Sequence, residues 1–357
     1  MKVYKLYANP ADLRNLNKDI WTEEFIKARL IDEEKIYEVL LSFRGHQIRK
    51  HQKKSYNILF KNPWYKEGVH EIHLNAEYKD PSLIRNRLSM DFFNHIDVLA
   101  PKTEHVLLYI NGVFKGIYLQ LESMDQDSLK KRGLPLGPIF YATDDDANFS
   151  LLTAEGNPKP TLLAGYTRKC GTDEDEAFII DLMICINTFI DEEFNKKIAE
   201  LIDVEEYLRW LAGVVCTQNF DGFVHNYALY RNSETGLFQI SPWDYDGTWG
   251  RDIHGDKLSL DYVPIQGYNT LTARILNNPE YGQSYKTILT SILESKFSVE
   301  YLSPIIEKLF NQIRPYIGKD PFTKSRAEQF DDEYPFILQF IKNRNEYLLQ
   351  HLPSLTR

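Results

Sequence analysis

The stretch of sequence that decides the fold runs from D-G-F-V-H-N at 221–226 to P-W-D-Y-D-G at 242–247. Between these two motifs, residues 227–231 and 237–240 have the composition of short β-strands, and the turn that joins them contains Thr235-Gly236. An acid and an amide therefore precede a predicted hairpin, and two further acids follow it. Each motif also has a plain turn interpretation, because Asp-Gly pairs and Asn side chains favour turns.

The predicted secondary structure changes near residue 140, from mainly strands before it to mainly helices after it. The earlier part contains β-type runs, which are predicted at 3–8, 36–43, 54–60, 71–74, 105–110 and 116–121, with an Asn-Gly hairpin turn at 111–112. One main helix interrupts them, with Asp80 as its N-cap and Pro81 at its first position. Helices are predicted at 177–188, 204–216, 270–276, 285–293 and 336–349. We therefore predict an α+β fold with a β-rich N-lobe at 1–140 and a helical C-lobe at 141–357.

Composition excludes several classes of protein. The chain has 357 residues, 43% of them hydrophobic and 26% charged, which is ordinary for a globular protein and excludes a mainly disordered, collagen-like or coiled-coil state. The net charge of −9 disfavours nucleic acid and anionic membranes as partners and favours basic ones. No apolar run approaches the ~20 residues of a membrane span, and the N-terminus lacks the apolar region of a signal peptide. Three widely spaced cysteines indicate reduced thiols in a cytosolic compartment.

The acids and the amide around the hairpin stand in the order that phosphoryl transfer from ATP requires. That reaction needs an acid near the attacking hydroxyl and oxygen ligands for the metal; in protein kinases an Asp, an Asn five residues later and an Asp after a hairpin fill these roles. Asp221 lies five residues before Asn226, and Asp244 follows after 18 more. Asp244 and Asp246 end a predicted strand two residues apart, so both can converge on one hard cation. The order of the motifs favours a metal–nucleotide site over two unrelated turns.

The sequence F-R-G-H-Q-I-R-K-H-Q-K-K at 43–54 is strongly basic and contains no acid. Such clusters bind phosphates, and Gly45 allows close approach of the backbone. Alternation along the predicted strand places Lys54 on the apolar face with Tyr56, and Lys53 on the opposite face. We therefore expect Lys54 to be the buried lysine, paired with a phosphate and a carboxylate. An exposed basic strand is the alternative.

Aromatic and acidic residues complete the candidate site. Glu122 ends the hairpin strand with the sequence Y-L-Q-L-E (118–122), and Tyr141 lies in I-F-Y-A-T-D-D-D-A-N-F (139–149). Tyr141 and Trp243 are candidates to sandwich an adenine ring, with core packing as the alternative. The three acids at 144–146 are expected to form a solvated loop rather than a metal site.

Nearly the whole chain resembles the CotH family of Bacillus spore coat proteins, which are regarded as atypical protein kinases. The segments that carry the resemblance are K-K-S-Y (53–56), H-L-N-A-E-Y-K-D-P-S-L (73–83), F-Y-A-T-D-D-D-A-N-F-S (140–150), L-R-W-L-A-G (208–213), F-D-G-F-V-H-N-Y-A-L-Y-R (220–231) and P-W-D-Y-D-G-T-W-G-R-D-I-H-G (242–255). The resemblance implies a bilobal kinase-like fold, distantly similar to secretory-pathway kinases. It also implies ATP with Mg²⁺ (or Mn²⁺) as cofactors, autophosphorylation, and spore coat proteins rich in Ser, Lys and Arg as substrates. The implied location is the mother-cell cytoplasm and then the spore coat.

The resemblance also implies roles for individual residues. The implied catalytic residues are Asp221, Asp244 and Lys54, and the implied metal ligands are Asn226, Asp244 and Asp246. Lys54 and Arg44 are implied to bind the phosphates of the cofactor. Glu122, Tyr141 and Trp243 are further candidates for cofactor binding from the sequence itself. The G-x-G-x-x-G, H-R-D, D-F-G and A-P-E motifs of ordinary protein kinases do not occur in the chain. The carboxylate partner of Lys54 stays open among Glu77, Asp80, Asp91 and Glu122. Two other functions remain open as well: a spore coat scaffold with a degenerate site, or the same fold acting on a small molecule or transferring AMP to proteins.

Overall fold

The computed structural model describes residues 1–64 and 68–355, which form a mixed α+β fold of two units. Unit 1 comprises Met1–Arg87, Lys102–Ser123 and Ile305–Pro335, and unit 2 comprises Leu88–Pro101, Met124–Pro304 and Phe336–Arg357. The division differs from the predicted boundary at residue 140, because 305–335 belong with the N-terminal strands, whereas 88–101 and 124–140 belong with the helical region. Tertiary packing of segments far apart in the sequence creates these exceptions, and local sequence patterns do not reveal such packing.

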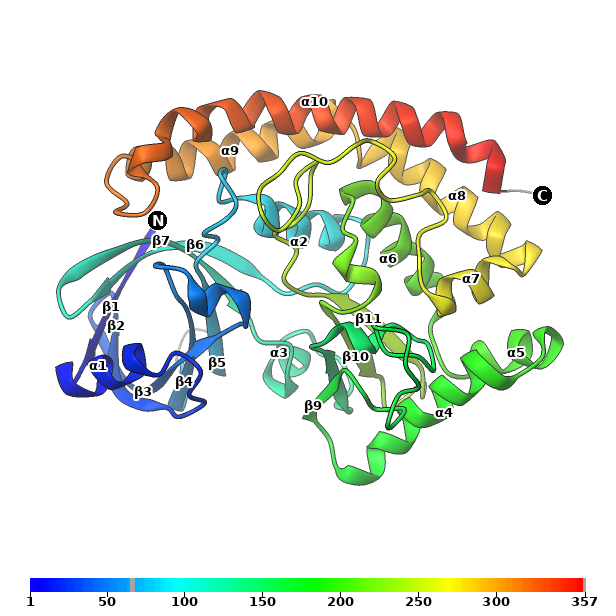
Figure 1. Ribbon diagram of the computed structural model, residues 1–357, viewed down its shortest axis with the longest axis horizontal. Coiled ribbons are helices and arrows are strands. Elements are labelled where there is room, and N and C mark those ends of the chain that lie inside the picture. Colours follow the sequence, from blue (N-terminus) through cyan, green and yellow to red (C-terminus); the bar gives the residue numbers. More distant parts are fainter. Residues whose placement is uncertain (65–67, 356–357) are drawn as a thin grey trace. The chain divides into compact units, whose positions relative to one another are not determined.

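Unit 1 is built around a closed barrel of seven strands among the described residues (Figure 1). The strand order is β1-β2-β3-β4-β5-β7-β6, and β1 closes the barrel by pairing in parallel with β6. The strands are β1 (Lys2–Ala8), β2 (Ile26–Asp32), β3 (Lys35–Arg44), β4 (Ser55–Trp64), β5 (Val69–Asn75), β6 (Thr103–Ile110) and β7 (Val113–Glu122). Side chains alternate in and out, so Leu6, Leu30 and Leu41 fill the barrel. The predicted turn at 111–112 is confirmed: Asn111 and Gly112 both have positive φ, as a tight two-residue hairpin loop requires.

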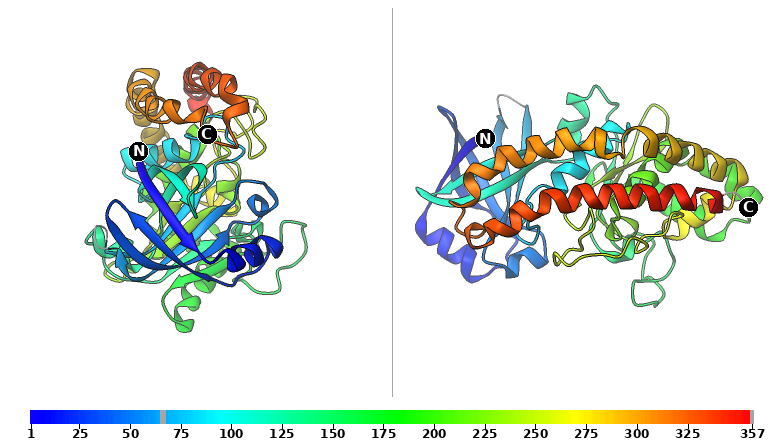
Figure 2. Two further views of the ribbon diagram at one scale, coloured as in Figure 1. Left: turned by 90° about the vertical axis from the view of Figure 1, so that its left-hand side faces the viewer. Right: turned by 90° about the horizontal axis from the view of Figure 1, so that it is seen from above.

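The helices of unit 1 are more numerous than predicted. α1 (Pro10–Lys18) begins with Asn9 as N-cap and Pro10 at its first position, which is a recognisable start signal in the sequence. Residues 305–335 include part of α9 (Val299–Ile317) and part of α10 (Ala327–His351), which run side by side (Figure 2). Between these two helices, the ring centroids of Phe310 and Phe330 are 4.8 Å apart. The remaining short elements are the 3-10 turns η1 (Gln47–Lys50) and η5 (Lys324–Arg326).

The helix predicted to start after Asp80 begins later, at Arg85, as α2 (Arg85–His95). The carboxylate of Asp80 accepts the amides of Ser82 and Arg85 at 2.9 Å each, and Leu83 has a positive φ of 58°. Asp80 therefore caps an irregular turn that leads into the helix, and its oxygens also bind the Arg85 guanidinium at 2.5 Å.

Unit 2 contains an antiparallel sheet of order β11-β10-β8-β9 and most of the helices. Its strands are β8 (Ile139–Ala142), β9 (Tyr166–Cys170), β10 (Tyr227–Arg231) and β11 (Phe238–Pro242). Its helices are α3 (Gln126–Lys131), α4 (Glu176–Thr188), α5 (Asp191–Ile198), α6 (Val204–Thr217), α7 (Thr270–Leu276) and α8 (Pro279–Ser295), with the turns η2 (Asp145–Ala147), η3 (Asp173–Asp175), η4 (Asp221–Phe223) and η6 (Leu352–Leu355). The predicted hairpin is confirmed, with Tyr227 paired to Pro242. Over the described residues, no helix has both the length and the apolarity of a membrane span.

Candidate active site

Strand pairing in unit 2 brings the two predicted motifs together. Asn226 directly precedes β10 and Asp244 lies two residues beyond β11. The Asn226 carbonyl oxygen accepts the Trp243 amide at 3.0 Å, and the Asn226 side-chain nitrogen lies 3.4 Å from the Asp244 carbonyl oxygen. The hairpin register therefore sets the side chain of Asn226 beside the backbone of Asp244. We call Asp221, Asn226 and Asp244 the acidic site.

The backbone at the acidic site adopts conformations that are uncommon for residues other than glycine. Asn226 has φ 57° and Asp244 has φ 58°, both in the left-handed region. Asn and Asp tolerate this region better than other residues, and such conformations cluster at ligand sites. Gly222 fixes the preceding loop: a Cβ there would lie 2.6 Å from the buried Tyr245 hydroxyl, so the loop packs closely only with glycine.

Negative charge accumulates around Asp221. Burial raises the pKa of its carboxyl group, and the charges of Asp145, Asp244 and Asp252 raise it further, while the His225 imidazole acts in the opposite direction. The sequence did not identify Asp145 and Asp252. Asp145 belongs to the acidic run that was expected to be a solvated loop; its side chain is exposed, but its Oδ1 lies 2.7 Å from His225 Nδ1. No spacing rule links it to Asp221, because the two segments meet only in the folded chain.

The acidic site offers oxygen atoms that suit a hard divalent cation. Mg²⁺ is usually held by one or two carboxylates together with substrate phosphates rather than by an all-protein cage. Within residues 1–64 and 68–355, no three His, Cys, Asp or Glu side chains converge as a ready-made metal site. A site at Asp244 and Asn226 would thus need phosphate oxygens to complete it, and these assignments stay predictions.

The chain beyond Asp244 is held by buried aromatic residues. Tyr245 and Trp249 are fully buried, and the Trp249 indole donates to Ser89 Oγ at 2.9 Å. The Trp249 amide donates to the Thr217 carbonyl oxygen at 2.9 Å. Asp246, between the two aromatics, is half-buried, and its role as a further ligand stays a prediction.

In unit 1 the structure reverses the expected burial of the two lysines. Lys53 is the buried one, with 1% exposure, and its ammonium donates to the Ile117 carbonyl oxygen at 2.5 Å and pairs with Asp320 Oδ2 at 3.4 Å. Lys54 is half-buried, and its ammonium contacts the Arg49 carbonyl oxygen. The expectation that Lys54 is the buried lysine is wrong, because β4 begins at Ser55 and strand alternation does not extend to the residues before it. Its phosphate-binding role stays a prediction.

Basic groups nevertheless gather at this end of β4. Burial lowers the pKa of His51, and the charges of Lys79 and Lys54 lower it further, so the three side chains lie within electrostatic range. Arg44, the last residue of β3, donates to the Asn75 side-chain oxygen. Charge-assisted hydrogen bonds from such groups suit phosphate oxygens.

The aromatic sandwich is not present. The rings of Tyr141 and Trp243 touch, with centroids 5.1 Å apart and planes tilted by 45°. An adenine ring stacked between them would require the two rings to be separated by about twice the ~3.5 Å contact distance. Tyr141 packs in a hydrophobic cluster with Met124, whose amide donates to the Tyr141 hydroxyl at 2.9 Å. The core-packing alternative therefore describes this pair, and a stacking role for either ring stays a prediction.

The proposed carboxylate partners of Lys54 have other contacts in unit 1. Asp80 pairs with Arg85, Glu77 accepts from the Asn86 side chain at 3.1 Å, and Glu122 accepts the Lys102 amide at 3.1 Å. The sequence missed Asp320, which instead pairs with the neighbouring Lys53.

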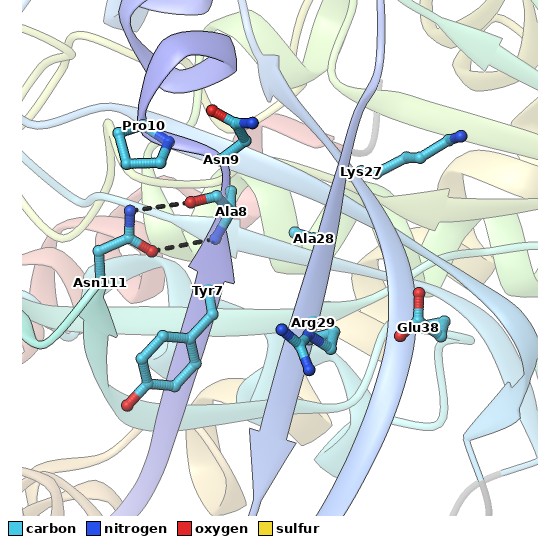
Figure 3. A pocket seen from close by; sticks show the side chains of 9 residues that line it. All are labelled: Tyr7, Ala8, Asn9, Pro10, Lys27, Ala28, Arg29, Glu38 and Asn111. Carbon is cyan, nitrogen blue, oxygen red and sulfur yellow. Dashed lines mark hydrogen bonds between the residues drawn. The ribbon is translucent and has the colours of Figure 1, made fainter.

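A cavity of about 590 Å³ lies elsewhere on unit 1, against β1 and β2 (Figure 3). Its lining consists of Tyr7, Ala8, Asn9, Pro10, Lys27, Ala28, Arg29, Glu38 and Asn111. The Asn111 side chain fixes one wall by bonding the Ala8 amide at 3.0 Å and the Ala8 carbonyl oxygen at 2.9 Å. None of the predicted site residues lines this cavity.

Known proteins resemble the chain over most of its length. The family described as CotH kinase protein matches residues 41–348. The chain is 50% identical over 356 residues to inner spore coat protein H of Bacillus subtilis (strain 168), covering 99% of this chain and 98% of that protein. It is 29% identical to the inner spore coat protein H-like protein of the same organism, covering 92% and 94%, and 24% identical to invasin CotH2 of Rhizopus delemar, covering 66% and 40%.

Two of the solved structures that resemble the chain have low TM-scores and low sequence identity to it. A chain of the Shewanella oneidensis HipA–HipB–operator DNA complex gives a TM-score of 0.42 at 12% identity, covering 97% of this chain and 73% of that one. The Helicobacter pylori proinflammatory kinase CtkA gives a TM-score of 0.33 at 11% identity, covering 84% and 94%.

Proposed function

We propose that this chain, which belongs to the CotH kinase protein family, transfers the γ-phosphoryl group of ATP to serine hydroxyls of basic spore coat proteins and to itself. The family match supports a kinase-type enzyme, and the relative named as a spore coat protein supports action on the coat. The observation that carries the proposal is the hairpin register that sets Asn226 beside Asp244, close to Asp221. We further propose that the protein acts in the mother-cell cytoplasm and then in the spore coat.

In this proposal each polar group has one task. Asp244 and Asn226, with Asp246, bind Mg²⁺, which neutralises charge on the phosphates of ATP when it is bound. Lys54 and Arg44 donate hydrogen bonds to phosphate oxygens. Asp221 accepts a hydrogen bond from the acceptor serine and takes its proton as the serine oxygen bonds to the γ-phosphorus and the bond to ADP breaks. The raised pKa of Asp221 makes its carboxylate a stronger base.

The proposal is tested by following the label from ATP. The protein is incubated with Mg²⁺ and a Ser-, Lys- and Arg-rich peptide, with ATP labelled at either the α- or the γ-phosphate. We expect only the γ-label on the peptide and on the protein, and none on a peptide whose serines are replaced by alanine. Transfer of the α-label would indicate an adenylyltransferase. An absence of metal-dependent ATP turnover with any acceptor would favour the scaffold alternative.

A further inference from the structure

Arg49, like Lys53, is a cation of the basic stretch whose charged group faces inward. It lies in η1, within the loop between β3 and β4, and only 6% of the residue is exposed. The sequence predicts that the stretch binds phosphates, with Lys54 as its buried lysine. A buried guanidinium needs many hydrogen-bond acceptors, since it carries five donors in a rigid fork.

Backbone carbonyl oxygens supply most of these acceptors. The guanidinium donates to the carbonyl oxygens of Gly45 (2.7 Å), Phe43 (3.1 Å), Thr22 (3.2 Å) and Ile20 (3.3 Å). It also pairs with Glu23 at 3.0 Å, although the Glu23 side chain is 83% exposed and screened by water. One side chain thus joins the end of β3, the loop and the segment before β2.

The turn at Gly45 makes this arrangement compatible with only one residue type. Gly45 has φ 74°, and a Cβ there would lie 2.7 Å from Ile48 Cγ2. Ile48 packs against the barrel core. The loop therefore closes tightly over its own hydrophobic residue, and this closure points the Gly45 carbonyl oxygen at Arg49.

The backbone of Arg49 also contacts Lys54. The Lys54 ammonium donates to the Arg49 carbonyl oxygen, and the residue before Lys54 is anchored by its buried pair with Asp320. We propose that Arg49 is a positioning residue. Its guanidinium orders the loop, and its backbone carbonyl oxygen thereby holds the Lys54 ammonium in one place in the absence of nucleotide. This inference rests on the proposed function, in which Lys54 binds the phosphates of ATP.

The test compares two destabilised variants of unit 1. Arg49→Gln removes the fork, so we expect the KM for ATP to rise roughly 10-fold, with kcat changed much less, as for the loss of a charged hydrogen-bond partner. Hydrogen exchange of the amides at 46–54 should quicken. Leu6→Ala is the matched control, since Leu6 is fully buried in the barrel and outside the loop. It should lower the melting temperature and leave the KM and the loop amides unchanged. Both are measured well below their melting temperatures.

Arg49→Lys serves as a second variant if Arg49→Gln does not fold. A lysine keeps the charge but cannot reproduce the fork, so the KM should rise by a smaller factor in the same direction. The inference alone is overturned if the wild type binds ATP and the loop loosens in Arg49→Gln without a change in KM, or if Leu6→Ala raises the KM equally. If the wild type shows neither turnover nor ATP-dependent protection of any amide, the proposed function fails, and the inference fails with it.

Discussion

The acidic site of unit 2 and the basic loop of unit 1, residues 45–54 between β3 and β4, are both charged segments next to strand ends, yet their charges make different contacts. In the acidic site, Asn226 and Asp244 are presented by the hairpin and remain half-buried. In the basic loop, Arg49 and Lys53 are turned inward to backbone carbonyls and Asp320. The comparison teaches that a run of like charges does not indicate which members face a ligand, whereas strand pairing places residues at defined positions.

The largest effect is expected at Asp244. Asp244→Ala removes a charged metal ligand, so phosphotransfer should fall on the order of 10³-fold, in the range reported for loss of one strong electrostatic contact in a transition state. Metal-dependent stabilisation by ATP should vanish with it in a thermal-shift titration. Asp256→Asn, on the exposed turn beyond, is the control and should change neither. Full stabilisation of Asp244→Ala by ATP and Mg²⁺ would contradict the metal assignment.

The next effect separates Asp221 from Asp244 within the acidic site. Asp221→Asn keeps the shape and removes the base, so transfer should drop by about 10²–10⁴-fold. Binding of ATP and Mg²⁺ should be retained, because the lost interaction belongs to the transition state. The measurement is single-turnover transfer beside the same thermal-shift titration. Near-normal transfer would make Asp221 a turn residue.

The two regions also differ in how far the sequence could predict them. The hairpin at 227–242 follows from local composition and turn chemistry, so the neighbourhood of Asn226 and Asp244 was predictable. The partner of Lys53 was not, because Asp320 lies 267 residues further along the chain. No periodicity connects a residue before β4 to the segment between α9 and α10. The same reason hid Asp145, which meets His225 only through folding.

The basic loop supplies the third prediction, a contrast between neighbouring lysines. Lys53→Met leaves Asp320 buried without its cation, so the free energy of unfolding should fall by about 3–5 kcal/mol. Lys54→Met should change it by no more than about 0.5 kcal/mol and should raise the KM for ATP instead. Urea unfolding and ATP kinetics on both variants make the comparison.

The double variant Lys53→Met/Asp320→Leu is the control for the third prediction. It removes both charges, so it should recover part of the stability that Lys53→Met loses. Equal stability of the two single-lysine variants would mean that the burial of Lys53 has no energetic consequence.

The smallest effect concerns Glu206, a buried acid of unit 2. Burial and, to a smaller extent, the negative charge of Asp203, the N-cap of α6, together raise the pKa of Glu206 to about 8. The folded state therefore holds its proton more tightly than the unfolded state, in which the pKa is near 4.5. Stability from this group is complete below about pH 4.5 and is lost as pH rises toward about 8.

Glu206→Gln keeps the shape of the side chain and removes the titration. The wild-type free energy of unfolding should therefore fall relative to the variant by on the order of 1–3 kcal/mol between about pH 5 and about pH 8, as measured by urea unfolding across that range. Taking the difference between the two proteins cancels the titration of all other groups. A difference that does not vary with pH would mean that Glu206 is ionised in the folded protein. Unit 2 would then tolerate a buried carboxylate without a matching cation, and the contrast with the paired Lys53 would disappear.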